Sequence, residues 1–288
     1  SQNQDNSKQE NIQQTFKESN PISNEQPIQQ TIKEPNSKSS KEIEDPNVIN
    51  MDIDEPIPFK LSVPLCGHTR PISALALDTP GVRVLSGSYD SQLKCWDFPG
   101  MTKQLLPFRD FEPCGAYCIN QISYSYDGTH YIVAPDSPRA KVFTRDGAEV
   151  VEFVRGDQYL NDLANTKGHT APLSGAQWHP YEMETIMTSS MDSTVRIWNL
   201  EKAKRKQDYI IKAKTEKSLK VSITSSTYDW EGKYIAAACM DGSIQIWPSK
   251  GPFLRPQLIK RKAHEPDRIT CINYASDGHQ LITRGFDH

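Results

Sequence analysis

Residues 168–199 read GHTAPLSGAQWHPYEMETIMTSSMDSTVRIWN, and apolar and polar positions alternate through two segments of this stretch. Alternation over about 4–8 residues is typical of half-buried strands. A tight turn at Met191-Asp192-Ser193 follows, and a segment rich in β-branched residues then runs to Trp198-Asn199. This order predicts a turn followed by three antiparallel strands.

The same order recurs along the chain. Gly67-His68 opens a complete copy, whose strands are expected at 73–78, 83–88 and 93–96. Aromatic residues close four copies at positions 96, 143, 198 and 247, a period of roughly 50 residues. A Gly-His…Trp-Asp signature at such a period is typical of a four-stranded propeller blade. The chain therefore resembles WD-repeat proteins, with Asn199 in place of one closing Asp.

The remaining copies depart from this pattern. The second, at 118–143, lacks Gly-His and has Phe143 where the tryptophan is expected, and its fourth strand is expected at 148–154. The fourth copy keeps Trp247, but Ala237 replaces the hydroxyl residue. The fifth copy would place its tryptophan beyond the last residue. We therefore expect the sequence to be the front part of a longer protein.

The resemblance to WD repeats implies a set of four side chains in each intact copy, here called a tetrad. Its members are expected to form one hydrogen-bond chain from a turn carboxylate through an imidazole and a hydroxyl to an indole. By position they are His68, Ser86, Asp90 and Trp96; His169, Thr188, Asp192 and Trp198; and His264, Thr283 and Asp287. A hydroxyl, a histidine and an aspartate could also form a nucleophilic triad, but a catalytic hydroxyl must be exposed beside an oxyanion site. We expect structural tetrads and no catalytic residue.

The predicted fold is all-β, a WD-repeat β-propeller at 59–288. Blades are expected near 67–110, 115–155, 168–212 and 219–262, with a partial fifth at 263–288. Residues 1–58 are rich in Gln, Asn and Ser and cannot bury enough apolar surface to offset ordering entropy, so a disordered arm is expected there. A short docking motif at 51–55, within this arm, is an alternative to a purely solvated linker. Residues 59–63 are expected to form the strand that enters the propeller.

Composition narrows the function. With 288 residues and a net charge of −3, the chain does not have the basic balance of a nucleic-acid coat protein. No run approaches about 18 apolar residues, so no membrane partner is expected. Six scattered cysteines without CxxC spacing indicate reduced thiols. Zinc-ligand spacings and glycine-rich phosphate loops are absent from the sequence, so we expect no metal, cofactor or small-molecule substrate.

Several stretches are more specific than the repeat itself: PFRDFEPCGAYCIN at 107–120, ANTKGHTA at 164–171, DGSIQIW at 241–247 and TRGFD at 283–287. Together they resemble the gastrulation-defective-like subfamily of nuclear WD-repeat proteins over roughly 60–288. The resemblance implies a non-enzymatic nuclear scaffold in chromatin, RNA-processing or ubiquitin-ligase assemblies, with the cytoplasm as an additional location. In many cullin-4 ligase receptors a blade ends in the motif Trp-Asp-x-Arg. None of the blade tryptophans in this sequence begins that motif.

Two surfaces are candidates for partner binding. A large side chain precedes each turn aspartate, and these residues, with Arg70, are expected on one rim: Tyr89, Met191, Met240 and Phe286. Methionine and aromatic residues are common interface anchors, although each could pack against its own turn instead. The connector at 201–220 is basic, and its candidate phosphate-binding residues are Lys204, Arg205, Lys206, Lys212 and Lys214. A solvent-exposed outer strand and loop would account for these basic residues equally well, without any bound phosphate.

These observations support three hypotheses. The first is a scaffold that assembles proteins through its rim. The alternative is a subunit that contacts RNA or DNA through the basic connector. A hydrolase is a remote third, and it requires an exposed, unshared tetrad hydroxyl.

Overall fold

The computed structural model describes residues 63–160, 162, 165–266, 269–278 and 280–286, and these residues form β-strands and loops without helices. The expected polar arm at 1–58, most of the entry strand expected at 59–63, and Asp287 lie outside the described residues. The all-β fold is confirmed.

Four sheets have four strands each, in antiparallel order from the first strand to the fourth. The first sheet contains β1 (Ile72–Leu77), β2 (Arg83–Ser88), β3 (Leu93–Asp97) and β4 (Arg109–Phe111). The second contains β5 (Ile119–Tyr124), β6 (His130–Pro135), β7 (Lys141–Thr144) and β8 (Glu149–Glu152). The third contains β9 (Leu173–Trp178), β10 (Thr185–Ser190), β11 (Thr194–Asn199) and β12 (Tyr209–Lys212).

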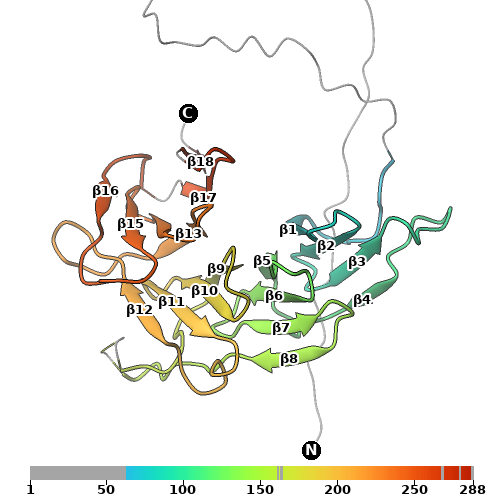
Figure 1. Cartoon of the computed structure of the whole chain (residues 1–288), viewed down its shortest axis with the longest axis horizontal. Coiled ribbons are helices and arrows are strands. Elements are labelled where there is room, and N and C mark those ends of the chain that lie inside the picture. Colours follow the sequence, from blue (N-terminus) through green and yellow to red (C-terminus); the bar gives the residue numbers. More distant parts are fainter. Residues whose placement is uncertain (1–62, 161, 163–164, 267–268, 279, 287–288) are drawn as a thin grey trace, which may run out of the picture. The chain divides into compact units, whose positions relative to one another are not determined.

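The fourth sheet contains β13 (Ile223–Tyr228), β14 (Tyr234–Cys239), β15 (Ile244–Pro248) and β16 (Leu258–Lys260). The fifth consists of β17 (Ile269–Tyr274) and β18 (Leu281–Gly285). The first strands of successive sheets lie next to one another, β1 by β5, β5 by β9, β9 by β13 and β13 by β17. The sheets therefore follow one another around an arc with their first strands innermost (Figure 1).

Pairing register is equivalent from sheet to sheet. The closing aromatic residue of each third strand stands opposite the second residue of the preceding strand: Val84 with Trp96, Tyr131 with Phe143, Ile186 with Trp198 and Ile235 with Trp247. Phe143 thus occupies the tryptophan position of the second sheet, where its ring stacks on Tyr131 at 5.6 Å between centroids. Packing replaces the missing polar groups there.

The hydrophobic core is divided between neighbouring sheets. One cluster joins the first and second sheets around Leu85 and Ile119, and a second joins the second and third sheets around Trp178 and Trp198. Two more join the third to the fourth sheet and the fourth to the fifth. The second, third and fourth sheets are therefore covered on both faces by their neighbours, and the loops at the two ends of their strands lie at the surface.

Candidate interaction surfaces

The third sheet carries a complete tetrad. The Trp198 indole donates to Thr188 Oγ1 (2.7 Å), and the Thr188 hydroxyl lies 2.8 Å from His169 Nε2. His169 Nδ1 lies 2.9 Å from Asp192 Oδ2. A neutral imidazole protonated on Nδ1 satisfies every step of this chain. The four side chains therefore connect the loop before the sheet with β10, its turn and β11.

The glycine before His169 has a steric role. A Cβ atom added to Gly168 would lie 1.9 Å from the Val154 carbonyl oxygen. The adjacent backbone is hydrogen-bonded across the same contact, since the Gly156 N–H donates to the His169 carbonyl at 2.8 Å. Only glycine lets the two backbones approach this closely.

The first sheet repeats the arrangement. Ser86 Oγ accepts from the Trp96 indole at 2.9 Å and lies 2.7 Å from His68 Nε2, while His68 Nδ1 lies 3.0 Å from Asp90 Oδ2. In the fifth sheet His264 Nε2 lies 2.7 Å from Thr283 Oγ1. The Ser86 and Thr188 hydroxyls are buried and already accept an indole N–H, so neither has the exposed, unshared oxygen that a nucleophile needs.

The two complete tetrads keep their carboxylates ionised. Burial alone would raise the pKa of Asp90, but hydrogen bonds from the Gln92 and Thr69 backbone and from His68 outweigh it and lower the pKa to about 2. Burial would likewise raise the pKa of Asp192, and its contacts with His169 and Thr194 instead hold that pKa far below its usual range. Burial lowers the pKa of His169 against the pull of Asp192. The pair is therefore a carboxylate and a neutral imidazole.

A fully buried arginine adds to the third tetrad. Arg196 donates from Nη1 to the Thr166 carbonyl (3.0 Å) and from Nη2 to Thr166 Oγ1 (2.7 Å). Its Nη2 atom also lies 3.9 Å from Asp192 Oδ2. The ANTKGHTA stretch is thereby tied to β11. Sequence reasoning missed this contact because arginine is usually exposed and its partner lies 30 residues earlier.

The rim residues project into solvent. The exposed fractions are 47% for Tyr89, 40% for Met191, 41% for Met240 and 68% for Phe286. Backbone bonds hold three of these turns alike: the N–H groups of the first three residues donate to the carbonyls of Pro71, Pro172 and Ser222 at 2.9–3.2 Å. Arg70 lies on the same rim, because its Nη1 atom donates to the Tyr89 carbonyl at 3.4 Å. A substantial part of each rim side chain is therefore accessible to a partner.

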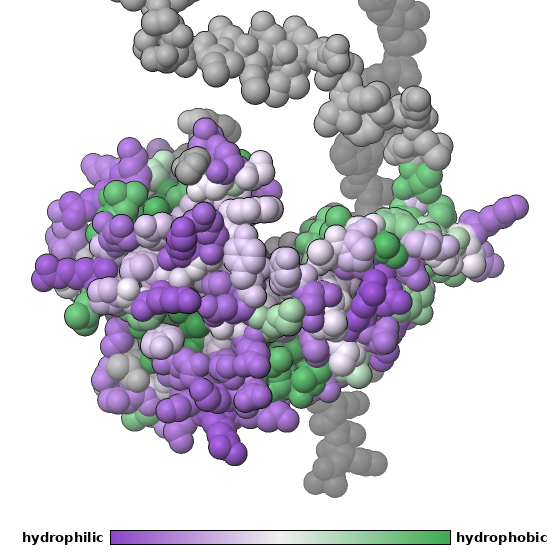
Figure 2. Space-filling model, in the orientation of Figure 1, coloured by the Kyte–Doolittle hydropathy of each residue, from purple (hydrophilic) through white to green (hydrophobic). Residues whose placement is uncertain are grey.

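The structure does not bring the five candidate phosphate-binding residues together. Lys204, Arg205 and Lys206 lie in the turn after β11, over which Figure 2 shows hydrophilic residues gathered. Lys212 stands opposite Thr194 at the other end of β12, and Lys214 follows it. The strand β12 therefore separates the two groups. Lys212 is also paired with Asp162 at 3.2 Å.

Lys214 instead meets a second basic segment. It lines a cleft of about 930 Å³ with Lys217, Arg255, Arg261 and Lys262. Arg261 pairs with Glu216 at 2.8 Å across this cleft. The sequence contained both segments, but only the pairing of β15 with β16 places the later one beside Lys214.

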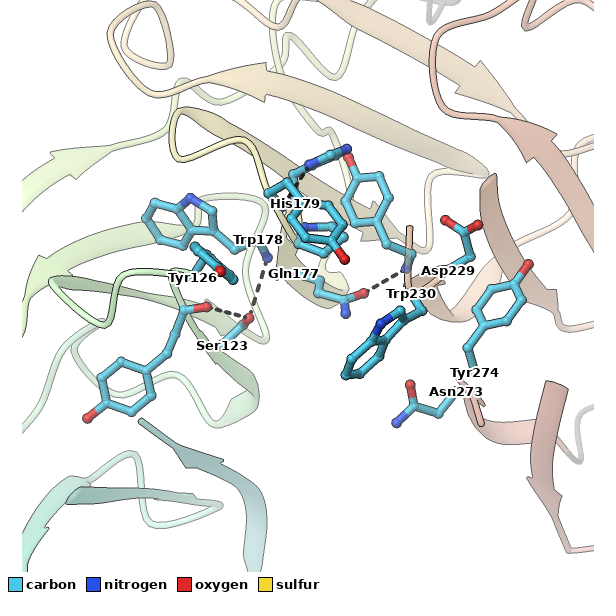
Figure 3. A pocket seen from close by; sticks show the side chains of 13 residues that line it. Ser123, Tyr126, Gln177, Trp178, His179, Asp229, Trp230, Asn273 and Tyr274 are labelled. Atoms are coloured by element: carbon cyan, nitrogen blue, oxygen red, sulfur yellow. Dashed lines mark hydrogen bonds between the residues drawn. The ribbon is translucent and has the colours of Figure 1, made fainter. Parts of the chain in front are cut away.

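An aromatic pocket of about 410 Å³ lies at the end of the strands opposite the rim (Figure 3). It is formed where β5, β9, β13 and β17 end, and residues from all four strands line it. Sequence reasoning missed it. A signal was present, because these strands all end in an aromatic residue: Tyr124, Trp178, Tyr228 and Tyr274.

The described residues contain neither a candidate metal site nor a candidate membrane-spanning helix. None of their His, Cys, Asp and Glu side chains gather in a group of three or more that could hold a metal ion. Within the same residues there is no helix with the length and apolar character needed to cross a membrane.

Comparison with known protein families identifies the repeats of this chain as WD repeats. The model of the "WD domain, G-beta repeat" family matches residues 59–97, 161–199 and 214–248. These matches cover the first, third and fourth copies of the repeat. The degenerate second copy, with Phe143 at the tryptophan position, lies outside them.

The chain is also similar to longer proteins. It is 42% identical over 232 residues to the Xenopus laevis "WD repeat-containing protein 70", covering 80% of this chain and 37% of that protein. It is 42% identical over 217 residues to the Homo sapiens protein of that name, covering 75% of this chain and 33% of the relative. With the Drosophila melanogaster "Gastrulation defective protein 1 homolog" the identity is 38% over 232 residues, with coverages of 80% and 35%. The chain thus spans about a third of the length of these relatives.

A solved structure shares the fold. The β-propeller domain of Cps50 (Swd1) from Myceliophteria thermophila has a TM-score of 0.60 and 16% identity, over 75% of this chain and 62% of that one. At this identity the likeness concerns the fold alone.

Proposed function

Since the chain belongs to the WD-repeat proteins of the gastrulation-defective-like type, we propose that it is a non-enzymatic scaffold that binds other proteins through its rim. One observation carries the proposal. Large apolar or aromatic side chains stand exposed at the same position of four turns, those of the first, third, fourth and fifth sheets. Methionine and aromatic side chains are common anchors of protein interfaces, and their recurrence at one position of the repeat supports a shared binding surface.

The proposal extends to a nuclear location and to membership of a multi-subunit assembly involved in chromatin, RNA processing or ubiquitin ligation. The similarity to the subfamily supports this extension, and the chain spans only about a third of its relatives. Proximity labelling in nuclei, with the labelled proteins sorted into these three kinds of assembly, tests it. Labelling confined to the cytoplasm would contradict the location.

The rim itself is tested by Tyr89→Ala combined with Met191→Ala. Interface anchors contribute about 2 kcal/mol each, so labelling of nuclear partners should fall more than tenfold if both side chains contact them. Tyr209→Ala is a matched control, because Tyr209 is 54% exposed but lies at the other end of β11 and β12, opposite Ile197. Equal labelling by the double variant and the control, with unchanged thermal unfolding, would show that the rim residues do not bind the labelled partners.

A second candidate function rests on the basic cleft around Lys214. Lys217, Arg255, Arg261 and Lys262 converge there from two segments, and such a cluster can neutralise RNA phosphates. Binding to a labelled single-stranded RNA, followed by fluorescence anisotropy, should weaken steeply as salt rises. Lys214→Glu with Lys217→Glu should abolish it, whereas Lys204→Glu with Lys206→Glu, at the other end of β12, should reduce it much less. Absence of binding at low salt would exclude this function.

A further inference from the structure

The aromatic pocket opposite the rim has the composition of a cation-binding site. We propose that it binds a lysine or arginine side chain of a basic peptide between the exposed rings of Tyr126, Tyr181 and Trp230. This site lies at the far end of the strands from the rim and goes beyond the proposed function.

The three rings are exposed at equivalent places in three successive sheets. Tyr126, Tyr181 and Trp230 follow β5, β9 and β13 by two or three residues, and their exposed fractions are 54%, 54% and 63%. The rings of Tyr126 and Tyr181 are 6.0 Å apart between centroids and tilted by 47°. Figure 3 shows Tyr126 and Trp230 on opposite sides of the pocket, with Gln177 between them. An aromatic face attracts a cation, and several faces around one site add to this attraction.

His179 ties together the two loops that carry Tyr181 and Trp230. Its Nδ1 atom accepts from the backbone N–H groups of Tyr181 (3.2 Å) and Glu182 (3.0 Å). Its Nε2 atom lies 3.3 Å from the Gly232 carbonyl, to which it donates. These bonds tie the Tyr181 loop to the Trp230 loop. Because Nδ1 accepts from both N–H groups, it points away from the pocket ligand and toward the Tyr181 loop.

The surrounding loops are acidic. The five loops that join first to second strands contain one lysine, Lys233, no arginine, and the carboxylates Asp78, Asp127, Glu182, Glu184, Asp229, Glu231 and Asp277. Some of these charges are partly neutralised, as Asp78 pairs with Arg145 at 2.7 Å and Glu182 with Lys250 at 3.2 Å. The surplus of negative charge still attracts a basic partner and repels an acidic one.

The lining favours a cation over other ligands. None of the described residues that line the pocket is a lysine or arginine, so an anion would find no charged partner. Ser123, Gln177 and Asn273 supply oxygen acceptors at the inner end, and each already accepts one hydrogen bond from a neighbouring strand. A cationic N–H donor can bond the second lone pair of these oxygens, whereas a purely apolar side chain cannot.

The chain carries its own probe for the test. Of the five tryptophans, all within the described residues, Trp230 alone is exposed, and the other four are at most 3% exposed. Acrylamide quenching of tryptophan fluorescence therefore reports mainly on Trp230. A bound side chain should protect it from quenching.

The experiment titrates the full chain with Gly-Ser peptides that differ in one central residue: lysine, trimethyl-lysine, arginine or norleucine. We expect the cationic peptides to protect Trp230 and to bind about tenfold more tightly than the norleucine peptide. Labelled peptides then test variants by anisotropy. Trp230→Ala and Tyr126→Ala should each weaken binding several-fold, Trp230→Phe should weaken it less, and Tyr117→Ala should leave it unchanged. Tyr117 is a matched control, 55% exposed and outside the pocket.

Two results would overturn the proposal. One is equal protection by norleucine and lysine, which would make the pocket merely apolar. The other is wild-type affinity in Trp230→Ala with an unchanged melting temperature, which would place any binding elsewhere.

Discussion

The third and fourth sheets have the same register but different polar groups. Trp198 and Trp247 stand at equivalent positions and are both buried. Trp198 donates to the Thr188 hydroxyl, whereas the Trp247 indole N–H has no hydrogen-bond partner among the described residues. Ala237 is the reason, since it occupies the position of Thr188. Packing alone can therefore hold the tryptophan, and the tetrad is an addition to it.

The comparison also separates the tetrad from the rim. The Met240 N–H bonds the Ser222 carbonyl at 2.9 Å, just as the Met191 N–H bonds that of Pro172 at 3.1 Å. Exposure of the two methionines is nearly the same, 41% and 40%. The backbone thus holds the rim turn even without a histidine. Changes in a tetrad should alter stability, while changes in the rim should alter binding.

The largest effect is expected from making the third sheet resemble the fourth. Thr188→Val keeps the shape but leaves His169 Nε2 and the Trp198 indole without their partner. Each buried unsatisfied group costs about 1–3 kcal/mol, so the free energy of unfolding should fall by about 2–4 kcal/mol. Urea denaturation measures it. Thr185→Val on the same strand is the control, because its hydroxyl bonds only the exposed Glu182 side chain.

Acid should have the next largest effect. The folded-state pKa of Asp90 is about 2, below the ordinary 3.8, so its contribution is complete above pH 3.8 and is lost as the pH falls toward 2. The loss amounts to about 2 kcal/mol. The lowered pKa of His169 acts with the same sign, because the unfolded chain takes up a proton that the folded imidazole does not. Denaturation midpoints from pH 7 to pH 2 should decline, and Asp90→Asn should flatten the acidic part. An unchanged slope in that variant would contradict this assignment.

The smallest effect is a gain in the fourth sheet. Ala237→Ser places an oxygen near the Trp247 indole, and one hydrogen bond adds about 1 kcal/mol if the hydroxyl fits. The urea midpoint should rise slightly. Ala236→Ser is the control. Ala236 is equally buried, but it lies one residue before Ala237 on the strand and so does not occupy the position equivalent to Thr188.

The sequence alone was sufficient to predict the features that recur from one repeat to the next. Gly67-His68 and the spacing of Asp90 to Trp96 located the first sheet, and the substitution at Ala237 marked where a bond is missing. The spatial arrangement of the basic connector could not be predicted in the same way, because residues close in sequence need not be neighbours in space. An antiparallel strand carries Lys206 and Lys212 to opposite ends.

Contacts between repeats were beyond such reasoning. The Arg196 to Thr166 bonds join a strand to a loop that precedes the sheet, and nothing in the local pattern distinguishes a buried arginine from an exposed one. The aromatic pocket has the same origin. Tyr126 and Trp230 are about a hundred residues apart, and only the packing of successive first strands makes them part of one site.

The most direct measurement compares Trp198→Phe with Trp247→Phe in urea denaturation. Both substitutions remove similar buried ring area, but only the first removes a satisfied N–H and leaves Thr188 without its donor. The loss of unfolding free energy should be about 1–2 kcal/mol larger for Trp198→Phe. Equal losses in the two variants would show that the tetrad hydrogen bonds do not stabilise the sheet.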